Sequence, residues 1–134
     1  MAAPRETDKS EKITINLGLI DLGQIDLLVA EGFFSNRTDF IRTAIRTELA
    51  NRVQAVDQTV TRKSLVLGTC HLTSADLEAM EEAGEQLELR VLGLATIASD
   101  VTPELALATI SHVEVLGAFR ASAAVKAALR SRTS

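Results

Sequence analysis

Residues 12–17, Lys-Ile-Thr-Ile-Asn-Leu, alternate polar and apolar side chains without a break. The apolar positions fall on one face: Ile13, Ile15 and Leu17. The polar positions fall on the other face: Lys12, Thr14 and Asn16. Period-two alternation with β-branched residues predicts a half-buried strand, and Gly18 follows as a breaker.

Two helices are predicted after this strand. The first has Asp21 as its N-cap and runs to about Glu31, with Gly32 placed where a glycine ends a helix. Its buried stripe comprises Leu22, Ile25, Leu28 and Val29. The second has Ser35 as its N-cap and covers residues 36–54. Its apolar face carries Phe40, Ile41, Ala44, Ile45 and Leu49, and its arginines lie off that face: Arg37, Arg42, Arg46 and Arg52.

The strand at residues 12–17 cannot be stable alone, because both of its edges leave backbone groups unpaired. Two short helices cannot enclose a core around it either. The economical solution is a homodimer, in which two strands pair antiparallel across a two-fold axis and four helices cover one face. The apolar strand residues then form the dimer core, and the polar residues face solvent.

A two-stranded ribbon fits the major groove of B-DNA, where base edges are distinguishable. Lys12 can donate to guanine acceptors and Asn16 can pair with adenine through two hydrogen bonds. Thr14 can bond a base edge or pack on a thymine methyl group. The polar face of the strand therefore predicts base recognition in double-stranded DNA.

Residues 12–50 resemble the ribbon-helix-helix family, including its CopG-like, Arc-like and ParD-like members. The resemblance rests on K-I-T-I-N-L and on residues 31–46, E-G-F-F-S-N-R-T-D-F-I-R-T-A-I-R. It implies a dimer whose strands read bases, and a phosphate site at the start of the second helix, on Ser35, Asn36 and Arg37. Free N–H groups and the positive end of a helix independently favour an anion there. Arg42 and Arg46 are expected on a solvated face, pairing with Glu48 or Asp39.

The net charge of −4 is unusual for a DNA-binding protein, because cations make the phosphate contacts. Residues 1–54 hold seven basic and eight acidic side chains. Weak non-specific DNA affinity is therefore expected. Residues 1–11 are predicted to be a flexible arm, in which Arg5 and Lys9 offer possible DNA contacts. Aromatic residues are 3% of the chain, too few for the stacking platforms that bind single strands.

Residues 55–63 are interpreted as a linker, although the preceding helix could extend into them. Beyond it, the tripeptide V-L-G recurs at residues 66–68, 91–93 and 115–117, and each copy leads into a segment of helical character. The sequence therefore predicts an α+β chain: residues 12–54 as the ribbon-helix-helix domain, residues 64–130 as three strand-turn-helix repeats, which could stack as a solenoid, and residues 131–134 as a tail. An ordinary compact α/β domain with a chance recurrence is the alternative.

The last strand of such a stack has an open edge, which favours pairing with another chain. Residues 60–134 are therefore expected to self-associate, and the whole protein to be a tetramer or larger. Residues 64–130 could also bind a different protein.

No metal, cofactor or catalytic site is predicted. Cys70 and His71 are adjacent and His112 is the only other histidine, so no metal-ligand spacing exists. Nickel-responsive ribbon-helix-helix regulators need a His-rich site, which this chain cannot supply. The acidic residues Glu78, Glu81, Glu82 and Glu85 are interpreted as a solvated helix face. One cysteine, no signal peptide and no membrane-length apolar run predict a cytoplasmic protein.

Three functions remain open on the same DNA-binding base. The first is a transcriptional repressor with a C-terminal oligomerisation or sensing domain. The second is the antitoxin of a toxin–antitoxin pair, which regulates its own promoter and binds a toxin protein. The third is a structural scaffold assembled from such dimers. The long apolar C-terminal region favours the first or the third, and an enzyme is not expected.

Overall fold

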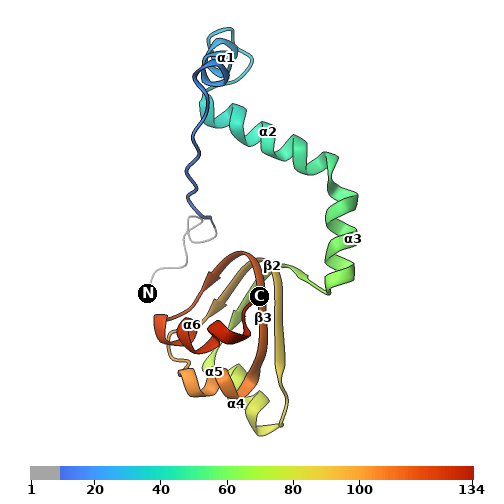
Figure 1. Cartoon of the computed structure of the whole chain (residues 1–134), viewed down its shortest axis with the longest axis vertical. Helices are drawn as coiled ribbons and strands as arrows, with labels where there is room; N and C mark the ends of the chain where they lie inside the picture. Colours follow the sequence, from blue (N-terminus) through green and yellow to red (C-terminus); the bar gives the residue numbers. More distant parts are fainter. Residues whose placement is uncertain (1–9) are drawn as a thin grey trace. The chain divides into compact units, whose positions relative to one another are not determined.

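The computed structural model describes residues 10–134, which form two compact units, residues 10–58 and residues 59–134 (Figure 1). The boundary between the units falls inside helix α3 (Val53–Lys63). The predicted arm contacts Arg5 and Lys9 lie outside the described residues. Within residues 10–134, none of the helices combines the length and apolar character needed to cross a membrane.

Helix α1 (Leu19–Ala30) begins two residues before Asp21, which was predicted as its N-cap. Gly18 occupies the cap position without a side-chain hydrogen bond, and Asp21 lies in the first turn, where the helix dipole favours a carboxylate. The predicted end is confirmed. Gly32 has a φ of 86° and its N–H bonds the carbonyl of Val29, while the N–H of Phe33 bonds that of Leu28. This pattern is a Schellman cap, which needs a left-handed residue at the position of Gly32.

Helix α2 (Arg37–Asn51) is capped by Asn36, not by Ser35 as predicted. The Asn36 side-chain oxygen accepts a hydrogen bond of 2.8 Å from the backbone N–H of Asp39, which is the N-cap geometry that asparagine favours. The helix also ends earlier than predicted, and α3 begins after Arg52. Residues 55–63, interpreted as a linker, are helical and belong to α3. This segment has no Gly or Pro and carries valines at helical spacing.

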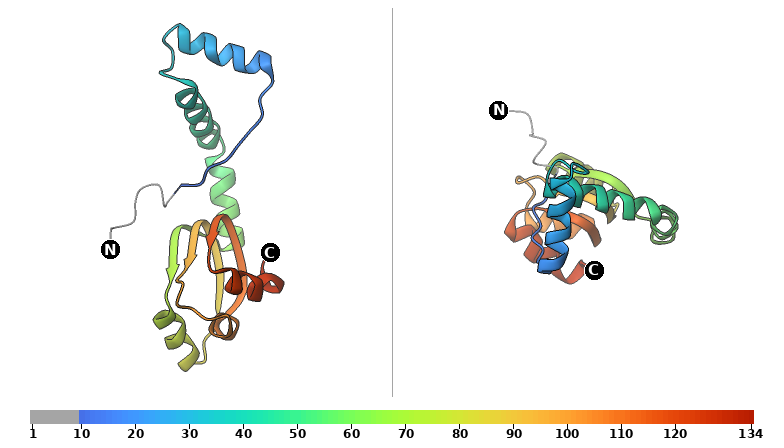
Figure 2. Two further views of the ribbon diagram at one scale, coloured as in Figure 1. Left: turned by 90° about the vertical axis from the view of Figure 1, so that its left-hand side faces the viewer. Right: turned by 90° about the horizontal axis from the view of Figure 1, so that it is seen from above.

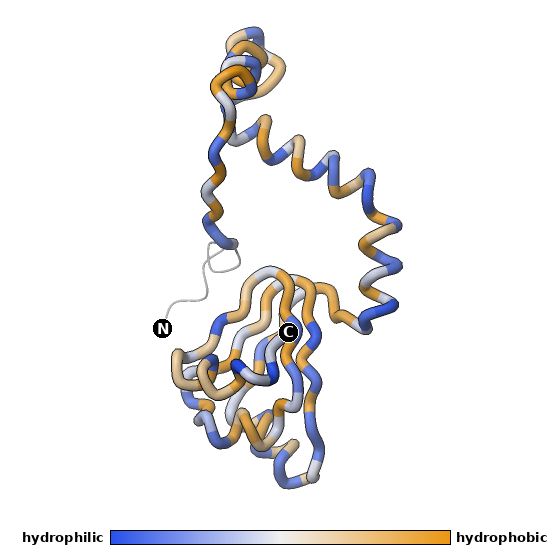
Figure 3. The backbone as a smooth tube through the Cα atoms, in the orientation of Figure 1, coloured by the Kyte–Doolittle hydropathy of each residue, from blue (hydrophilic) through white to orange (hydrophobic). Residues whose placement is uncertain are grey.

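The N-terminal unit has a small core. Between residues 10 and 58, Ile25 is the one buried residue, at 7% exposure, and Leu22, Leu28 and Val29 are half-buried as the predicted stripe requires. The rings of Phe34 and Phe40 meet edge to face at 5.0 Å. Figure 3 shows hydrophobic positions recurring along α2 between hydrophilic ones. Of these side chains, Ile45 and Leu49 are 46% and 58% exposed.

The C-terminal unit combines a three-stranded sheet with helices, so the predicted mixture of helix and strand is confirmed. Strands β1 (Val66–Leu72), β2 (Leu87–Ile97) and β3 (Ile110–Arg120) are parallel and lie in chain order (Figures 1 and 2). Each strand is followed by a helix: α4 (Ser74–Glu82), α5 (Pro103–Thr109) and α6 (Ala123–Leu129). A short 3-10 helix, η2 (Arg130–Arg132), precedes the last two residues.

The three V-L-G tripeptides lie side by side across the sheet. Gly68 pairs with Gly93, and Gly93 pairs with Gly117. Their φ angles are 130°, 140° and 117°, values that side chains disfavour. A Cβ atom on Gly93 would lie 2.2 Å from the carbonyl oxygen of Gly68, and one on Gly117 would lie 2.1 Å from that of Gly93. Glycine is thus required on β2 and β3 by the close approach of the neighbouring backbone.

The core of this unit lies between the sheet and its helices. Alternate residues of β2 point into it: Leu89, Val91, Ala95 and Ile97. They meet the buried faces of the three helices through Leu77, Ala106, Val125 and Leu129. Because one cluster contains residues from all three helices, α4, α5 and α6 cover the same face of the sheet. The opposite face has no helix from this set.

The outer edge of β3, expected to be open, is partly covered by the C-terminal residues. Thr133 forms a parallel bridge with Val113, and the N–H of Ser134 bonds the carbonyl of Val113 at 2.9 Å. The Arg132 guanidinium also donates to the carbonyls of Leu107 and Ile110. The tail therefore satisfies backbone groups at the first half of this edge, which weakens the expected route to edge-to-edge pairing.

Candidate nucleic-acid interface

The predicted strand at residues 12–17 has no regular secondary structure in one chain. A strand is defined by its ladder partner, and residues 10–134 provide none for this segment. Ile13, Ile15 and Leu17 are 74%, 57% and 40% exposed. Lys12, Thr14 and Asn16 are exposed as well. The structure therefore leaves the dimer core and the base-reading face as predictions, with all six side chains accessible.

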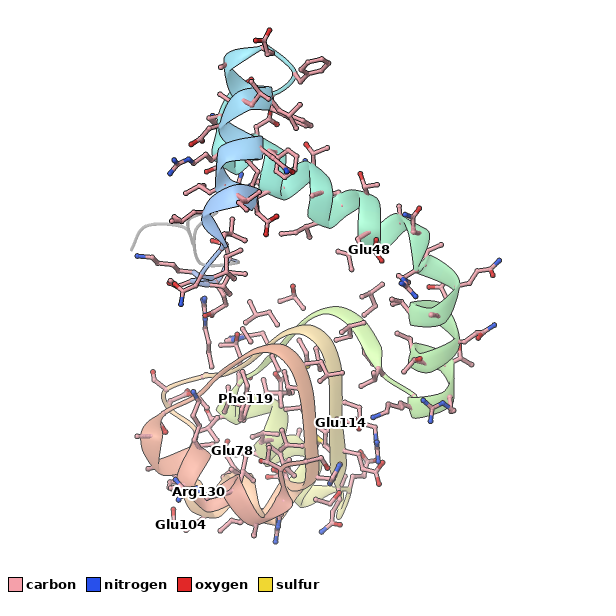
Figure 4. All side chains as sticks on the ribbon, turned by 45° about the horizontal axis from the view of Figure 1, so that its top comes forward. Glu48, Glu78, Glu104, Glu114, Phe119 and Arg130 are labelled. Carbon is pink, nitrogen blue, oxygen red and sulfur yellow. The ribbon has the colours of Figure 1, made fainter. Side chains whose placement is uncertain are left out.

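The start of α2 forms a polar depression of about 430 Å³. Its lining residues are Ser35, Asn36, Thr38, Asp39, Arg42 and Arg46. Two of the predicted phosphate-binding residues, Ser35 and Asn36, thus lie together. Two arginines interpreted as a solvated face lie there with them. Neither Arg42 nor Arg46 pairs with Glu48, labelled in Figure 4, whose carboxylate instead bonds Arg52 at 2.9 Å.

Backbone donors point out of this end of the helix. The first intrahelical bond runs from the N–H of Phe40 to the carbonyl of Asn36, and the N–H of Asp39 is capped by the Asn36 side chain. Within the described residues, no protein acceptor meets the N–H groups of Arg37 and Thr38, as helix geometry dictates. Asp39 opposes an anion here, and its carboxylate accepts from the Ser35 N–H at 2.9 Å.

Arg37, predicted to bind a phosphate, is paired with a carboxylate in this structure. Its guanidinium forms two hydrogen bonds of 2.8 Å to the carboxylate of Asp26 on α1. This pairing lowers the pKa of Asp26, mainly through the hydrogen bonds from Arg37, and raises the pKa of Arg37. Both side chains remain about half exposed, so a DNA phosphate can compete for the guanidinium. Sequence reasoning missed Asp26, because the pair joins two helices and follows no helical period.

Two of the residues considered for a metal site, His112 and Cys70, have other contacts. His112 shares a hydrogen bond of 2.9 Å with the Ser134 hydroxyl. Cys70 packs against the core cluster, and burial raises the pKa of its thiol. Within residues 10–134, no group of three or more His, Cys, Asp or Glu side chains is placed so that it could hold a metal ion.

A protein-family model described as the Ribbon-Helix-Helix transcriptional regulator family matches residues 8–126. The chain belongs to this family. Ribbon-helix-helix regulators typically bind DNA as dimers. The match covers both units, from the predicted strand to α6, so it extends far beyond residues 12–50, which carried the resemblance. No curated protein and no solved structure matches the chain.

In this ribbon-helix-helix chain, the predicted base-reading and phosphate-binding residues belong to one compact unit, residues 10–58. The depression at the start of α2 includes Thr38 and Asp39, which sequence reasoning did not assign to a site. Thr38 could have been found as the second residue of a correctly placed helix. Placing the N-cap at Ser35 shifted the helix start by one residue and hid that position.

Proposed function

We propose that this regulator is a sequence-specific repressor that binds double-stranded DNA as a homodimer through residues 12–17 of both chains. The observation that carries the proposal is the exposure of Ile13, Ile15 and Leu17 beside an almost coreless pair of helices. A second chain gives the segment its missing strand partner. It also leaves Lys12, Thr14 and Asn16 on the outer face of the ribbon.

The distribution of exposed apolar residues supports the dimer. Among residues 10–134, fourteen large hydrophobic side chains are exposed, and ten of them lie between residues 13 and 53. These include Leu27, Ile45 and Leu49 on α1 and α2, with exposures of 59%, 46% and 58%. Burying one such side chain fully contributes roughly 1.5–3 kcal/mol, so a few from each chain offset the cost of association.

The proposed ribbon reads bases with six side chains, three from each chain. Bidentate pairs of this kind discriminate by roughly 1–3 kcal/mol each against the wrong base. The start of α2 would position the ribbon by holding a phosphate with the N–H groups of Arg37 and Thr38, the side chains of Ser35 and Asn36, and the Arg37 guanidinium once Asp26 releases it. Phosphate contacts orient a protein on DNA without specifying sequence.

We assign the C-terminal unit to oligomerisation or interaction with another protein, and we assign it no catalysis. The glycine register supports an interpretation of the three V-L-G units as structural repeats. A core formed within residues 59–134 also favours a repressor over an antitoxin, whose C-terminal segment folds on its toxin. Neither a scaffold role nor a tetramer is needed for the DNA-binding proposal.

The test of base reading is a footprint on the regulator's own promoter region, followed by binding to the protected site and to unrelated DNA. Thr14→Ala with Asn16→Ala should reduce affinity for the site to the level seen with unrelated DNA. The matched control, Thr61→Ala with Asn51→Ala, removes the same groups from exposed helical positions and should leave the preference intact. If the ribbon variant still selects the same site, the ribbon is not the reader.

The test of the dimer is Ile15→Asp. This variant places two carboxylates in the proposed core, at a cost of several kcal/mol, because unpaired charges are expensive to bury. Specific DNA binding should disappear while the C-terminal unit keeps its circular dichroism. Retention of full site-specific binding would contradict the ribbon dimer.

A further inference from the structure

The face of the sheet that α4–α6 leave uncovered carries a row of leucines in register. Leu67 on β1 pairs with Leu92 on β2, which pairs with Leu116 on β3. All three occupy positions that alternate with the buried core residues, so they point away from the helices. Leu67 is 70% exposed, Leu116 is 47% exposed, and Leu92 is half-buried. Beyond the glycines, the next row on this face is Thr69, Leu94 and Ala118.

One end of this leucine face is closed within the unit. Lys63 forms an ion pair of 2.9 Å with Glu114. Leu65, two residues after Lys63, is buried at 7% exposure. Glu114, labelled in Figure 4, also accepts from Arg90 at 3.0 Å, and Arg90 bonds Glu88 at 3.3 Å. The four charges cancel. This border of the leucine face is therefore neutral and hydrogen-bonded, and its centre is apolar. Arg120, in register with Thr96, lies at the opposite border.

Purely parallel sheets are almost always covered on both faces. A contiguous exposed apolar patch on such a sheet marks an interaction site. Here the helices cover one face, and the ion pairs that join Lys63, Glu114 and Arg90 lie at one border of the other. The three leucines are left without a partner in the described chain.

We propose that the leucine face docks against the same face of a second copy of this chain, so that two sheets stack. Charge favours this partner over other surfaces of the unit. Two leucine faces meet through apolar centres, whereas a depression between α4 and α5 is lined by Glu78, Glu81, Asp100 and Glu104 and would bring acid against acid. A two-fold axis parallel to β2 places Leu92 of one chain opposite Leu92 of the other. It also places Leu67 of one chain opposite Leu116 of the other.

This inference rests on the proposed DNA-binding dimer, which brings the second copy close to the first. Two chains joined at their N-terminal units hold further copies of the leucine face at an effective concentration on the order of millimolar, so a modest interface suffices. Stacked sheets lie about 10 Å apart, and their facing side chains interdigitate to form a core. The interface gives the repressor a second site of association, separate from its ribbon.

The first experiment is a site-specific cross-link in the full chain. Cys70→Ala removes the native thiol, and Leu92→Cys places a thiol on the proposed axis. A short bismaleimide, matched to the sheet spacing of about 10 Å, should then convert the chain to a product of twice its mass. Glu81→Cys, on the helical side, should not react across chains. If Leu92→Cys cross-links no more than Glu81→Cys, another molecule or another part of the chain covers this face and the proposal is wrong.

The second experiment separates the leucine face from the ribbon. Sedimentation is measured at a chain concentration on the order of millimolar, which matches the effective concentration within the ribbon dimer. The two proteins are Ile15→Asp, which lacks the proposed ribbon dimer, and Ile15→Asp with Leu92→Lys. The first should still associate and the second should be a monomer with an unchanged circular dichroism spectrum. A monomeric Ile15→Asp protein would refute the leucine face while leaving the ribbon intact. An Ile15→Asp protein that still binds its DNA site refutes the ribbon without touching the leucine face.

Discussion

Replacing Gly93 by alanine should destabilise the C-terminal unit more than the same change at Gly68. Both glycines have φ angles near the same value, 140° and 130°, so both substitutions bear the strain of a side chain in a conformation that favours glycine. Such backbone strain costs on the order of 1–3 kcal/mol. Only Gly93 has a neighbour in the way, since its new Cβ would lie 2.2 Å from the carbonyl oxygen of Gly68.

The overlap at Gly93 can be relieved only by moving the backbone of β1 or β2, because the obstructing atom is a carbonyl oxygen. Overpacking of this kind costs about 1–3 kcal/mol beyond the strain. Gly68→Ala, which meets nothing within 4 Å, is the matched control. We therefore expect Gly93→Ala to lose about 4 kcal/mol and Gly68→Ala about 2 kcal/mol, against a total of roughly 5–15 kcal/mol for a typical domain.

The assay is urea unfolding of the full chain followed by circular dichroism, with hydrogen exchange of the peptide spanning residues 87–97 to assign the loss to β2. Exchange in α1 and α2 serves as an internal reference that should not change. Equal losses at Gly93 and Gly68 would show that strain alone explains the glycines. The close approach of neighbouring strands would then contribute nothing to the free energy lost at Gly93.

Two further predictions concern charged pairs. Asp26→Asn should release Arg37, so that the protein binds every DNA sequence more tightly and its affinity depends more steeply on salt. Asp57→Asn removes the same charge on α3 and is the control. An equal effect of Asp57→Asn would refute a specific role for the pair of Asp26 and Arg37. Lys63 lowers the pKa of Glu114 in the folded chain, so the stability contributed by this group is present above the unfolded pKa and lost as pH falls through the folded one. Glu114→Gln should therefore reduce the difference in unfolding free energy between about pH 6 and about pH 3, values that bracket the ordinary glutamate pKa of about 4.3. An unchanged difference in the urea titrations would exclude Glu114 as a source of acid sensitivity.

The sequence by itself was sufficient for the first two helices and for the alternation of strand and helix after residue 64, whereas the strand at residues 12–17 stays a prediction and α3 was interpreted as a linker. Alternation at residues 12–17 and Gly32 after an apolar stripe are local signals, because a helix end or a strand face depends on residues a few positions apart. The same is true of Pro103 at the first turn of α5. The family was also recognisable from the sequence, since the motif of residues 31–46 lies in one continuous stretch. Errors of three residues and of one residue arose at the two N-caps, where Gly18 and Asn36 compete with other suitable residues nearby.

Tertiary structure decided what depends on residues far apart in the chain. The pairing of Asp26 with Arg37 requires two helices to meet, and the covering of β3 by Thr133 requires the tail to return to the sheet. The recurrence of V-L-G was visible in the sequence, but the alignment of its leucines on one uncovered face was not. That alignment depends on strand order, parallel register and the side on which the helices pack. Side-chain alternation fixes two faces for each strand, and only the packing of the helices determines which of them is buried.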